Sequence, residues 1–571
     1  MNNINQISSL IWSIADDVLR GTFKPNEYGR IILPFVVLRR LDCVLEQNKD
    51  LAITTFESYK DKIDEPEDVV LKKLKLSFYN ISKFDLEKLK SDPTNIKQNF
   101  ENYIQGYSAN VRDIVKNFNL QPLVDKLDDN DKLYLLIDKY TTVDLHPDTI
   151  DNHQMGSIYE ELLRKFSEMT NEESGDHFTP RDIVQLLVTL VFGPDKKKLQ
   201  GKGLIRTIYD PCCGTGGLLS VGKQWVKDNI NSDISIELFG QERNDQTYAI
   251  CKSDQLISGE NPENIYGPNL STLTKDQLKD NKFDYIVANP PYGVSWKSEA
   301  DEIKEEAKDP DGRFVAGIPR TSDGSLLFLQ HMVSKMNPEG ARIGVVFNGS
   351  PLFTGDAGSG ESEIRKWIIE NDWLECIVSL PDRMFFNTGI TTYIWIVANN
   401  KSSDRKDKVQ LIDGSSFFSQ MRKNLGDKGK YISEEHTKQL FEIYQNNKEN
   451  EFCKIYPNNF FGYTKVVVEQ PVIEGGDIKT DKKGNPNPDT SLRDTERVPL
   501  SESIENYFER EVRPHLPDSW MDRSKDKIGY EINFTKYFYK FIPLRSLEEI
   551  SNELKTLDDE IQKLSLEMTD E

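Results

Sequence analysis

Residues 283–293, FDYIVANPPYG, carry groups that could hold a flat, amino-bearing heterocycle. Their alternating β-branched and apolar residues predict a strand, which two prolines then end. Directly after it, Asn289 supplies a side-chain amide, Pro290 a backbone carbonyl and Tyr292 an aromatic ring. Taken alone, the segment is more typical of a proline-rich turn with a partly buried tyrosine, so its chemistry depends on what the fold places beside it.

A glycine-rich turn follows an earlier predicted strand. Residues 204–209, LIRTIY, predict a short strand, and DPCCGTGG at 210–217 comes directly after it, before an apolar helix. A strand, a glycine-rich turn and a helix begin the doubly wound sheets that bind nucleotides. The turn lacks the Lys-Ser/Thr pair of a triphosphate loop and the glycine spacing of a dinucleotide site. It therefore predicts a site for a small-molecule cofactor, with Asp210 pointing into it.

An acidic residue ends the next predicted strand. Residues 234–239 lead into GQERN, where Glu242 is placed to accept hydrogen bonds from both hydroxyls of a ribose. Asp210, Glu242 and Asn289 thus all fall at the carboxyl ends of strands predicted in one sheet. Open α/β sheets bind their ligands at that edge. The three residues predict a single site and favour the functional interpretation of NPPY.

The segment GDHFTPRDI predicts the beginning of a helix. Thr179 is placed to cap it, Pro180 suits its first turn and Asp182 favours its positive end. A helix N-terminus can also hold a ligand's carboxylate. From the local sequence, capping alone is the simpler interpretation.

The elements that must position these residues fall into four regions. Residues 1–145 have apolar residues at three- and four-residue steps and predict an all-helical domain. Residues 146–425 alternate strand and helix patterns and predict the catalytic domain. Residues 426–540 predict an extension with a flexible, exposed insertion at 470–498, and 541–571 predict a coiled-coil-like helix.

The last region has apolar residues in strict three-four alternation, which is typical of a coiled-coil seam. They are Leu547, Ile550, Leu554, Leu557, Ile561, Leu564 and Met568. The segment is short for an independent coil, so we expect it to dock on the helices of a partner. Packing on its own chain is the alternative.

Three further features complete the expected organisation. Arg30, Arg39 and Arg40 interrupt an apolar helix and are expected on a solvated face, with a DNA-facing surface as the minority alternative. Residues 293–323 are polar and predict a long loop that is either functional or disordered. A last strand at 391–397 is expected to complete the sheet.

Composition limits the classes of function. The formal net charge is −22, so the chain as a whole repels phosphate, and binding to nucleic acid requires a local basic groove or a basic partner. No apolar run is long enough for a transmembrane helix and no secretory signal is present. The six cysteines lack zinc-ligand spacing, so no metal site is expected. A reducing cytoplasm fits best.

An ordered set of segments resembles the modification (methyltransferase) subunit of bacterial type I restriction-modification systems. Residues 10–41 resemble that family's helical leader domain. The other matching segments are GSIYEELLRKF, GDHFTPRDIV, DPCCGTGG, GQERN, NPPYG, GESEIRKWIIE, LPDRMFFNTGI and GYEINFTKYFYKF, in the family's order. NPPY alone is shared with other amino-group methyltransferases, including some that act on RNA or on protein glutamine.

The resemblance implies an α/β, Rossmann-like class I methyltransferase domain, with an N-terminal helical domain and a C-terminal helical tail, that uses S-adenosylmethionine. It implies Asn289, Pro290, Pro291 and Tyr292 as catalytic residues. The implied cofactor-binding residues are Asp176, His177, Phe178, Thr179, Pro180, Arg181, Asp210, Gly214, Thr215, Gly216, Gly217, Glu242, Asn244 and Asn269. Asp176-His177-Phe178 departs mildly from the family, which often has Tyr or Phe with Glu or Gln before Thr-Pro.

The implied product is N6-methyladenine in DNA. Asn289 and Pro290 can accept both amino hydrogens of adenine, which favours a tetrahedral nitrogen whose lone pair points at the methyl group. Transfer then depends on positioning rather than on a strong base. Tyr292 is expected to stack on the base once it has left the duplex. Cys212 lies in the cofactor turn, so we expect it to pack rather than act as a nucleophile.

The resemblance also implies partners. They are DNA and a separate specificity subunit, with two copies of this chain per specificity subunit, and a restriction nuclease subunit is a further candidate. No membrane partner is expected. We see no large target-recognition domain in the sequence, which favours delegated recognition. The alternatives are a methyltransferase for RNA or protein glutamine and a non-catalytic cofactor-binding scaffold.

Overall fold

The computed structural model describes residues 2–170, 179–539 and 546–569. The predicted cofactor residues Asp176, His177 and Phe178 lie outside these ranges. The chain divides into two units, Met1–Ile532 and Asn533–Glu571. In the described residues, no helix is both long and apolar enough to span a membrane.

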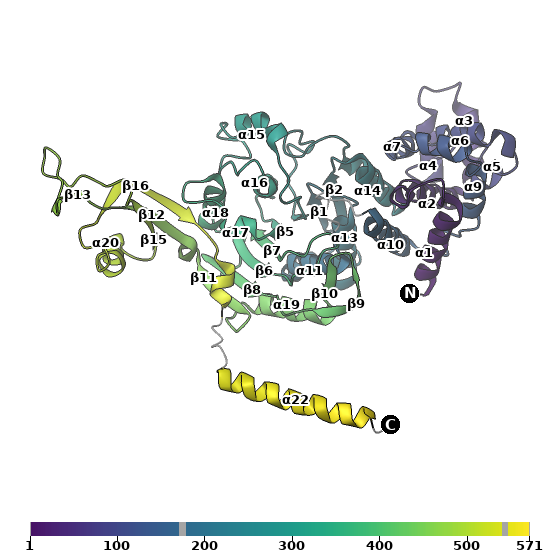
Figure 1. Ribbon diagram of the computed structural model, residues 1–571. Helices are drawn as coiled ribbons and strands as arrows, with labels where there is room; N and C mark the ends of the chain where they lie inside the picture. The colour runs from purple at the N-terminus through teal and green to yellow at the C-terminus, as the bar shows by residue number, and fades with distance from the viewer. Residues whose placement is uncertain (1, 171–178, 540–545, 570–571) are drawn as a thin grey trace. The chain divides into compact units, whose positions relative to one another are not determined.

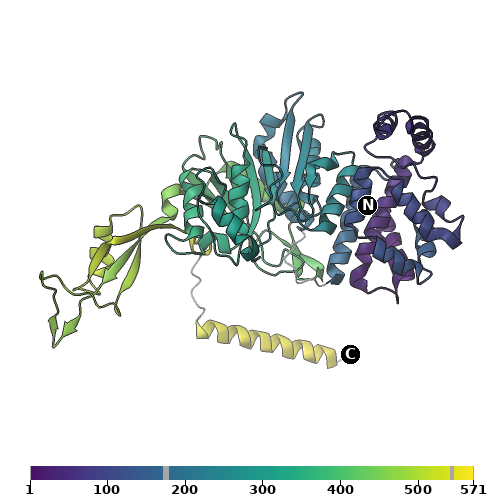
Figure 2. The same cartoon turned by 90° about the horizontal axis from the view of Figure 1, so that it is seen from above.

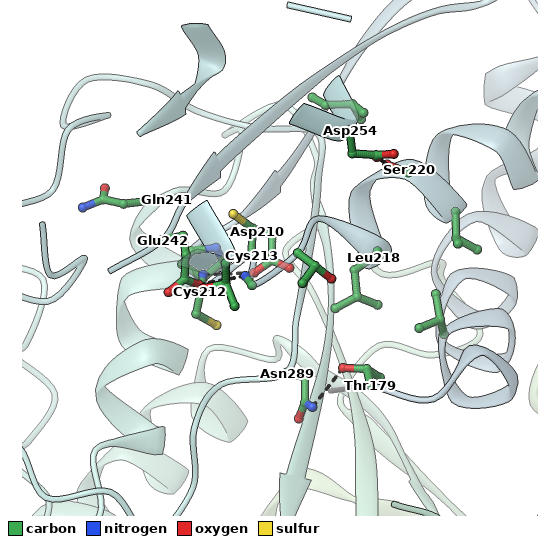
Figure 3. Close-up of a pocket in the computed structure, with 18 of the residues that line it drawn as sticks. Thr179, Asp210, Cys212, Cys213, Leu218, Ser220, Gln241, Glu242, Asp254 and Asn289 are labelled. Carbon is green, nitrogen blue, oxygen red and sulfur yellow. Dashed lines mark hydrogen bonds between the residues drawn. The ribbon is translucent and has the colours of Figure 1, made fainter. Parts of the chain in front are cut away.

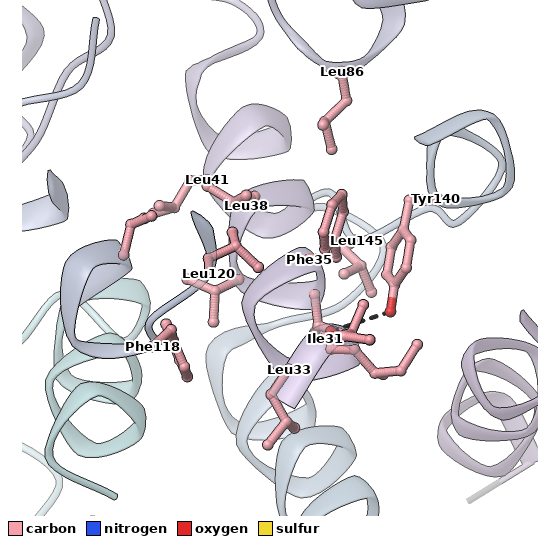
Figure 4. Close-up of a cluster of buried hydrophobic side chains, with 14 of the residues drawn as sticks. Ile31, Leu33, Phe35, Leu38, Leu41, Leu86, Phe118, Leu120, Tyr140 and Leu145 are labelled. Carbon is pink, nitrogen blue, oxygen red and sulfur yellow. Dashed lines mark hydrogen bonds between the residues drawn. The ribbon is translucent and has the colours of Figure 1, made fainter. Parts of the chain in front are cut away.

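The N-terminal part of the first unit is helical, as predicted (Figures 1 and 2). Its α-helices are α1 Asn2–Ile14, α2 Tyr28–Leu45, α3 Lys49–Tyr59, α4 Pro66–Leu74, α5 Leu86–Leu89, α6 Ile96–Gln105, α7 Ala109–Asn117, α8 Gln121–Asp128, α9 Leu133–Thr141 and α10 Asn152–Thr170. Helix α2 is buried almost all round and forms the centre of this group (Figure 4). Tyr140 from α9 donates a hydrogen bond to the Ile32 carbonyl of α2 at 3.1 Å.

The hydrophobic core of this part extends past the predicted boundary at residue 145. Phe166 from α10 belongs to it, and so do Ala249, Ile250 and Leu256 of helix α14, Asp245–Ile257. The helical part is therefore packed directly against an element of the neighbouring α/β part.

Arg40 is fully buried, so the expectation of a solvated position was wrong for this residue. Its guanidinium donates to the carbonyls of Leu145 and Ile150 at 2.6 and 2.8 Å. A third bond goes to the side chain of Asn152 at 2.8 Å. Arg40 thus connects α2 to the chain that leads into α10 and satisfies backbone groups that burial would otherwise leave unpaired.

A nine-stranded mixed sheet forms the centre of the α/β part, in the order β11-β8-β6-β7-β5-β4-β1-β2-β3. Its strands are β1 Ile205–Asp210, β2 Ser235–Gln241, β3 Ile265–Tyr266, β4 Tyr285–Ala288, β5 Arg342–Asn348, β6 Leu374–Ser379, β7 Thr392–Ala398, β8 Lys408–Asp413 and β11 Cys453–Pro457. β7 is antiparallel to β5 and to β6, and β11 is antiparallel to β8, while the other pairs are parallel.

Helices cover both faces of this sheet. One face packs on α11 Arg181–Phe192, α13 Gly217–Asn229 and α19 Glu434–Asn446. On the other face, Tyr209 of β1 stacks on Phe283 and contacts His331 of α16, Ser325–Ser334. The remaining helices of this part are α12 Lys196–Leu199, α15 Ala300–Glu306, α17 Ser350–Phe353 and α18 Gly360–Glu370.

The sheet continues beyond the strand that was expected to complete it. β7 is followed by β8 and, after the hairpin of β9 Ser419–Leu425 and β10 Lys428–Tyr431, by α19 and β11. The sheet therefore reaches Pro457, past the predicted end of the catalytic domain at residue 425.

A separate three-stranded sheet follows, formed by β12 Gly462–Glu469, β15 Asp494–Pro499 and β16 Trp520–Tyr530. The insertion predicted at 470–498 is mostly exposed and contains the short pair β13 Ile473–Glu474 and β14 Asp477–Ile478. Its last residues, 494–498, instead belong to β15. Helix α20, Ile504–Tyr507, completes this part.

In the part of the second unit that the structure describes, the helices are α21 Phe534–Phe538 and α22 Leu547–Thr569. Helix α22 coincides with most of the predicted coiled-coil-like segment. Four of its predicted seam residues are exposed, namely Leu547, Leu554, Leu557 and Ile561.

Candidate active site

A cavity of about 1140 Å³ lies at the carboxyl ends of β1, β2 and β4 (Figure 3). Asp210 is the last residue of β1, while Glu242 follows β2 and Asn289 follows β4. All three line the cavity, so the predicted meeting of the three strand ends is found in the structure. The predicted site residues in its wall are Thr179, Arg181, Asp210, Gly214, Thr215, Gly217, Glu242, Asn244, Asn269, Asn289 and Pro291.

Four other predicted site residues lie near the cavity without forming its wall: Pro180, Gly216, Pro290 and Tyr292. Tyr292, the expected stacking residue, is only 6 % exposed, and burial raises the pKa of its phenol. Its ring is therefore packed in protein rather than presented to the cavity.

Asp210 is an unusually basic carboxyl. Burial is the main cause that raises its pKa to about 7, and the negative charge of Glu242 adds to the increase. The backbone N–H of Cys212 donates to Asp210 Oδ1 at 3.0 Å, which works in the opposite direction. A nearby cation would favour the charged form of this carboxyl.

Glu242 joins the end of β2 to the glycine-rich turn. Its Oε2 accepts from the backbone of Gly214 at 2.8 Å, and its Oε1 accepts from the backbone of Asn244 at 2.7 Å. Each carboxylate oxygen can accept more than one hydrogen bond, so these contacts orient the group and leave it able to bind hydroxyls. Asn244 itself caps α14 by accepting from Gln246 and Thr247, both at 3.0 Å.

The glycine-rich turn needs glycine at Gly216. Its φ is +85°, and a Cβ there would come within 2.8 Å of Cys251 Sγ. Cys212 belongs to the same turn, and burial raises the pKa of its thiol well above its usual value. A neutral thiol is a weak nucleophile, in keeping with the expected packing role.

Thr179 does not cap the following helix, so that prediction was wrong. Helix α11 begins at Arg181, and its N-cap position is Pro180, which makes no side-chain cap. The hydroxyl of Thr179 instead accepts a hydrogen bond from Asn289 Nδ2 at 3.0 Å (Figure 3). Asp182 lies in the first turn as predicted, and it also binds Lys428 and the backbone N–H of Ile432.

The loop expected at 293–323 has a core of its own, which includes Trp296, Ile303 and Phe314. Arg313 anchors it, donating to the carbonyls of Thr272 and Leu273 at 2.9 and 2.7 Å. The same guanidinium bonds the Glu306 carboxylate at 2.6 Å and His331 Nδ1 at 2.9 Å. His331 Nε2 in turn lies 2.9 Å from the hydroxyl of Tyr209, the residue before Asp210.

Sequence reasoning missed part of the cavity wall. It includes Ser157 and Tyr159 of α10, Thr272 in the turn after β3, and Trp296. One sequence signal was available, because GSIYEELLRKF, which contains Ser157 and Tyr159, is among the segments that resemble the family.

Comparisons with known proteins agree with this geometry. The family model described as N-6 DNA Methylase matches residues 150–474, and the one described as HsdM N-terminal domain matches residues 7–140. The chain is 26 % identical over 500 residues to the type I restriction enzyme MjaIX methylase subunit of Methanocaldococcus jannaschii, covering 83 % of each chain. It is 31 % identical over 260 residues to the HindI methylase subunit of Haemophilus influenzae, covering 45 % of this chain and 54 % of that one.

Solved structures show the same fold. A type I restriction-modification methyltransferase subunit from Streptococcus thermophilus superposes with a TM-score of 0.64 at 20 % identity, covering 80 % of this chain and 96 % of that chain. A modification subunit of a putative type I restriction enzyme from Vibrio vulnificus gives a TM-score of 0.52 at 16 % identity, covering 89 % and 98 %.

Proposed function

Since the chain belongs to the N-6 DNA methylase family and is a DNA adenine-N6 methyltransferase of the type I restriction-modification class, we propose that Asn289 and Pro290 hold the target amino group beside a bound S-adenosylmethionine. The observation that carries this proposal is the convergence of Asp210, Glu242 and Asn289 on one cavity. RNA and protein glutamine are not favoured as substrates, because the family assignment points to DNA. A non-catalytic role is not favoured, because the NPPY segment is intact.

The cavity suits the cofactor. Glu242 is held by two backbone N–H groups in an orientation from which it can accept ribose hydroxyls. Asp210 lies where a cationic methionine end would favour its ionised form. The turn at 214–217 allows close backbone approach, because Gly214 and Gly217 line the cavity without a side chain. The bound cofactor supplies an electrophilic methyl group.

The amino group would be held by two acceptors. The oxygen of the Asn289 amide accepts one amino hydrogen, and the bond from Nδ2 to Thr179 holds the amide in one orientation. The Pro290 carbonyl accepts the second hydrogen. Extrusion of the adenine costs about a few kcal/mol, and stacking, about 1–3 kcal/mol, offsets part of that cost. Because Tyr292 is buried, this stacking requires its ring to turn toward the cavity when the base enters.

The partners of this reaction are DNA and a specificity subunit that reads the target site, with two copies of this chain per specificity subunit. A restriction nuclease subunit would join the same complex, and the complex would work in the cytoplasm. Support comes from the net charge of −22, which requires another source of DNA attraction, and from the exposed apolar residues of α22.

Transfer of labelled methyl groups from S-adenosylmethionine to genomic DNA tests the proposal. We expect sequence-specific N6-methyladenine when the full chain and its specificity subunit are combined, and little or none from either alone. Full sequence-specific activity of this chain alone would refute delegated recognition. Label in RNA or protein, with none in DNA, would refute the substrate.

A further inference from the structure

The β9–β10 hairpin is a basic element of an acidic chain. Residues 416–431 contain four basic side chains, at Arg422, Lys423, Lys428 and Lys430, and one acidic side chain, Asp427. The whole chain carries a net charge of −22. Such a local reversal of sign creates a positive region to which an anion can be drawn.

The hairpin is anchored beside the candidate active site. Lys428 is buried and donates to Asp182 Oδ2 at 3.0 Å and to the Met384 carbonyl at 2.9 Å. Asp182 belongs to the first turn of α11, three residues after Thr179, the partner of Asn289. Figure 1 shows β9 and β10 close to α11. Lys430 also anchors the hairpin, because it forms an ion pair with Asp382.

Residues 380–391, which contact the hairpin through the Met384 carbonyl, lie at the same sheet edge as Asn289. β6 is antiparallel to β7, which is antiparallel to β5, which is parallel to β4. β6 and β4 therefore run in one direction, and residues 380–391, which follow β6, leave the sheet at the edge where β4 ends. DNA that delivers an adenine to Asn289 must approach this edge.

One face of the hairpin presents basic and amide groups to solvent. Arg422 and Asn424 lie two residues apart on β9, so their side chains share a face. Arg383 lies over the same face, because its Nη2 and Asn424 Oδ1 both come within 3.0 Å of the position that a Cβ at Gly429 would occupy. Glycine at 429 makes room for this arrangement.

The two arginines of this face are available to a ligand. Both are exposed, and neither forms an ion pair with a carboxylate of the described residues. Among the described residues, the side chain of Arg383 makes one hydrogen bond, from Nε to the Asp427 carbonyl at 3.3 Å, and this bond does not use its terminal N–H groups. The cations that anchor the hairpin and the cations that face solvent are thus different residues.

We infer that the face formed by Arg383, Arg422 and Asn424 contacts the DNA backbone phosphates next to the flipped adenine. The inference rests on the proposed function. Arginine binds phosphate through paired N–H donors, and asparagine is a common additional donor to backbone oxygens. Contacts of this kind position the duplex without reading its sequence, which matches a subunit whose target is read by a partner.

The test uses the full chain assembled with its specificity subunit and a fluorescent duplex of random sequence. The variant Arg383→Asn/Arg422→Ala removes two charges, and asparagine tolerates the positive φ of residue 383, +57°. Arg383→Lys/Arg422→Lys keeps both charges. Lys482→Ala/Lys483→Ala removes two charges from exposed positions of the insertion and serves as the matched control.

The readout is the slope of log K for DNA against log salt concentration. Each lost phosphate contact should lower its magnitude by about 0.9, or about 1.8 for the first variant. We expect no change in the two controls and a raised KM for DNA in the first variant. An unchanged slope in that variant, or an equal decrease in the insertion control, would overturn the inference. Methyl transfer by the wild-type complex is measured separately, and its absence would refute the proposed function while the slope still tests the hairpin.

Discussion

The side-chain amide of Asn289 donates a hydrogen bond from Nδ2 to Thr179 Oγ1 at 3.0 Å, across 110 residues of sequence. This contact fixes the direction in which the amide oxygen, the acceptor of the group, points. It also connects the NPPY segment to Thr179, which lies two residues before α11 begins at Arg181. The segment before α11 and the amino-group site are therefore joined directly.

The first prediction concerns this hydrogen bond. Thr179→Val removes the acceptor while keeping the shape of the side chain, so the Asn289 amide loses its orientation. We expect kcat for methylation to fall by up to about tenfold, since a hydrogen bond contributes about 1 kcal/mol and about 1.4 kcal/mol is a factor of ten. Calorimetry with S-adenosylmethionine separates this orienting role from the cofactor-binding role that the resemblance implies for Thr179, and we expect kcat to fall by a larger factor than cofactor affinity. Thr179→Ser should keep wild-type activity, and a loss confined to cofactor affinity would contradict the orienting role.

The second prediction separates an amide-based from a thiol-based mechanism. Asn289→Ala should lower kcat by about 100-fold, because it removes an acceptor that positions the amino group. Cys212→Ala should keep most of the activity, because burial raises the pKa of this thiol and suppresses the thiolate. Single-turnover methyl transfer measures both, and equal losses would refute the proposed mechanism.

The third prediction is a pH dependence. Unfolded carboxyls of this type titrate near pH 3.9, whereas burial, with the charge of Glu242, raises the pKa of Asp210 to about 7. Between about pH 4 and about pH 7 the folded state therefore binds more protons, so the stability from this group is full below about pH 4 and is lost as pH rises through about 7. Asp210→Asn should gain stability relative to wild type across that interval. Parallel curves of Tm against pH would contradict it.

The strand ends of the site could be predicted because local sequence defines them. Asp210, Glu242 and Asn289 each follow an apolar run, and the edge rule for parallel strands brings such residues together without knowledge of packing. The N-terminal helices were predictable for a similar reason, since an apolar stripe such as Ile11, Ile14 and Val18 fixes the buried face.

Other features depend on contacts that local sequence does not contain. Thr179 has the residue type and spacing of a cap, but its hydroxyl bonds a residue 110 positions away. Arg40 resembles a surface residue until three acceptors from residues 145–152 surround it. Strand β11 follows a hairpin and a helix, so nothing near it shows that it rejoins the sheet.

The fourth prediction concerns the anchor of residues 293–323. Arg313→Met removes the guanidinium that binds the carbonyls of Thr272 and Leu273 and the Glu306 carboxylate, and leaves Glu306 the backbone N–H of residue 313. We expect stability to fall by on the order of 3 kcal/mol, and cofactor affinity to fall as well, because Thr272 and Leu273 line the cavity. Urea unfolding and calorimetry measure the two effects.

The matched control for Arg313 is Lys308 on the same loop. Its ion pair with Glu305 has both side chains more than 70 % exposed, and exposed pairs contribute about 0–1 kcal/mol. Lys308→Ala should therefore leave both stability and cofactor affinity near wild type. A comparable effect of the two variants would show that the loop is held by something other than the Arg313 contacts.

The last prediction concerns helix α22. Leu554 and Leu557 are 59 % and 49 % exposed and lie on the seam of the heptad pattern, so they are suited to pack against helices of a partner. Leu554→Glu/Leu557→Glu keeps helix propensity but places charges in that seam. We expect the variant to lose co-purification with the specificity subunit and sequence-specific methylation, while S-adenosylmethionine still binds. Lys555→Glu, on the same helix and outside the seam, should assemble normally. Assembly of the double variant at wild-type affinity would show that the seam is not the docking surface.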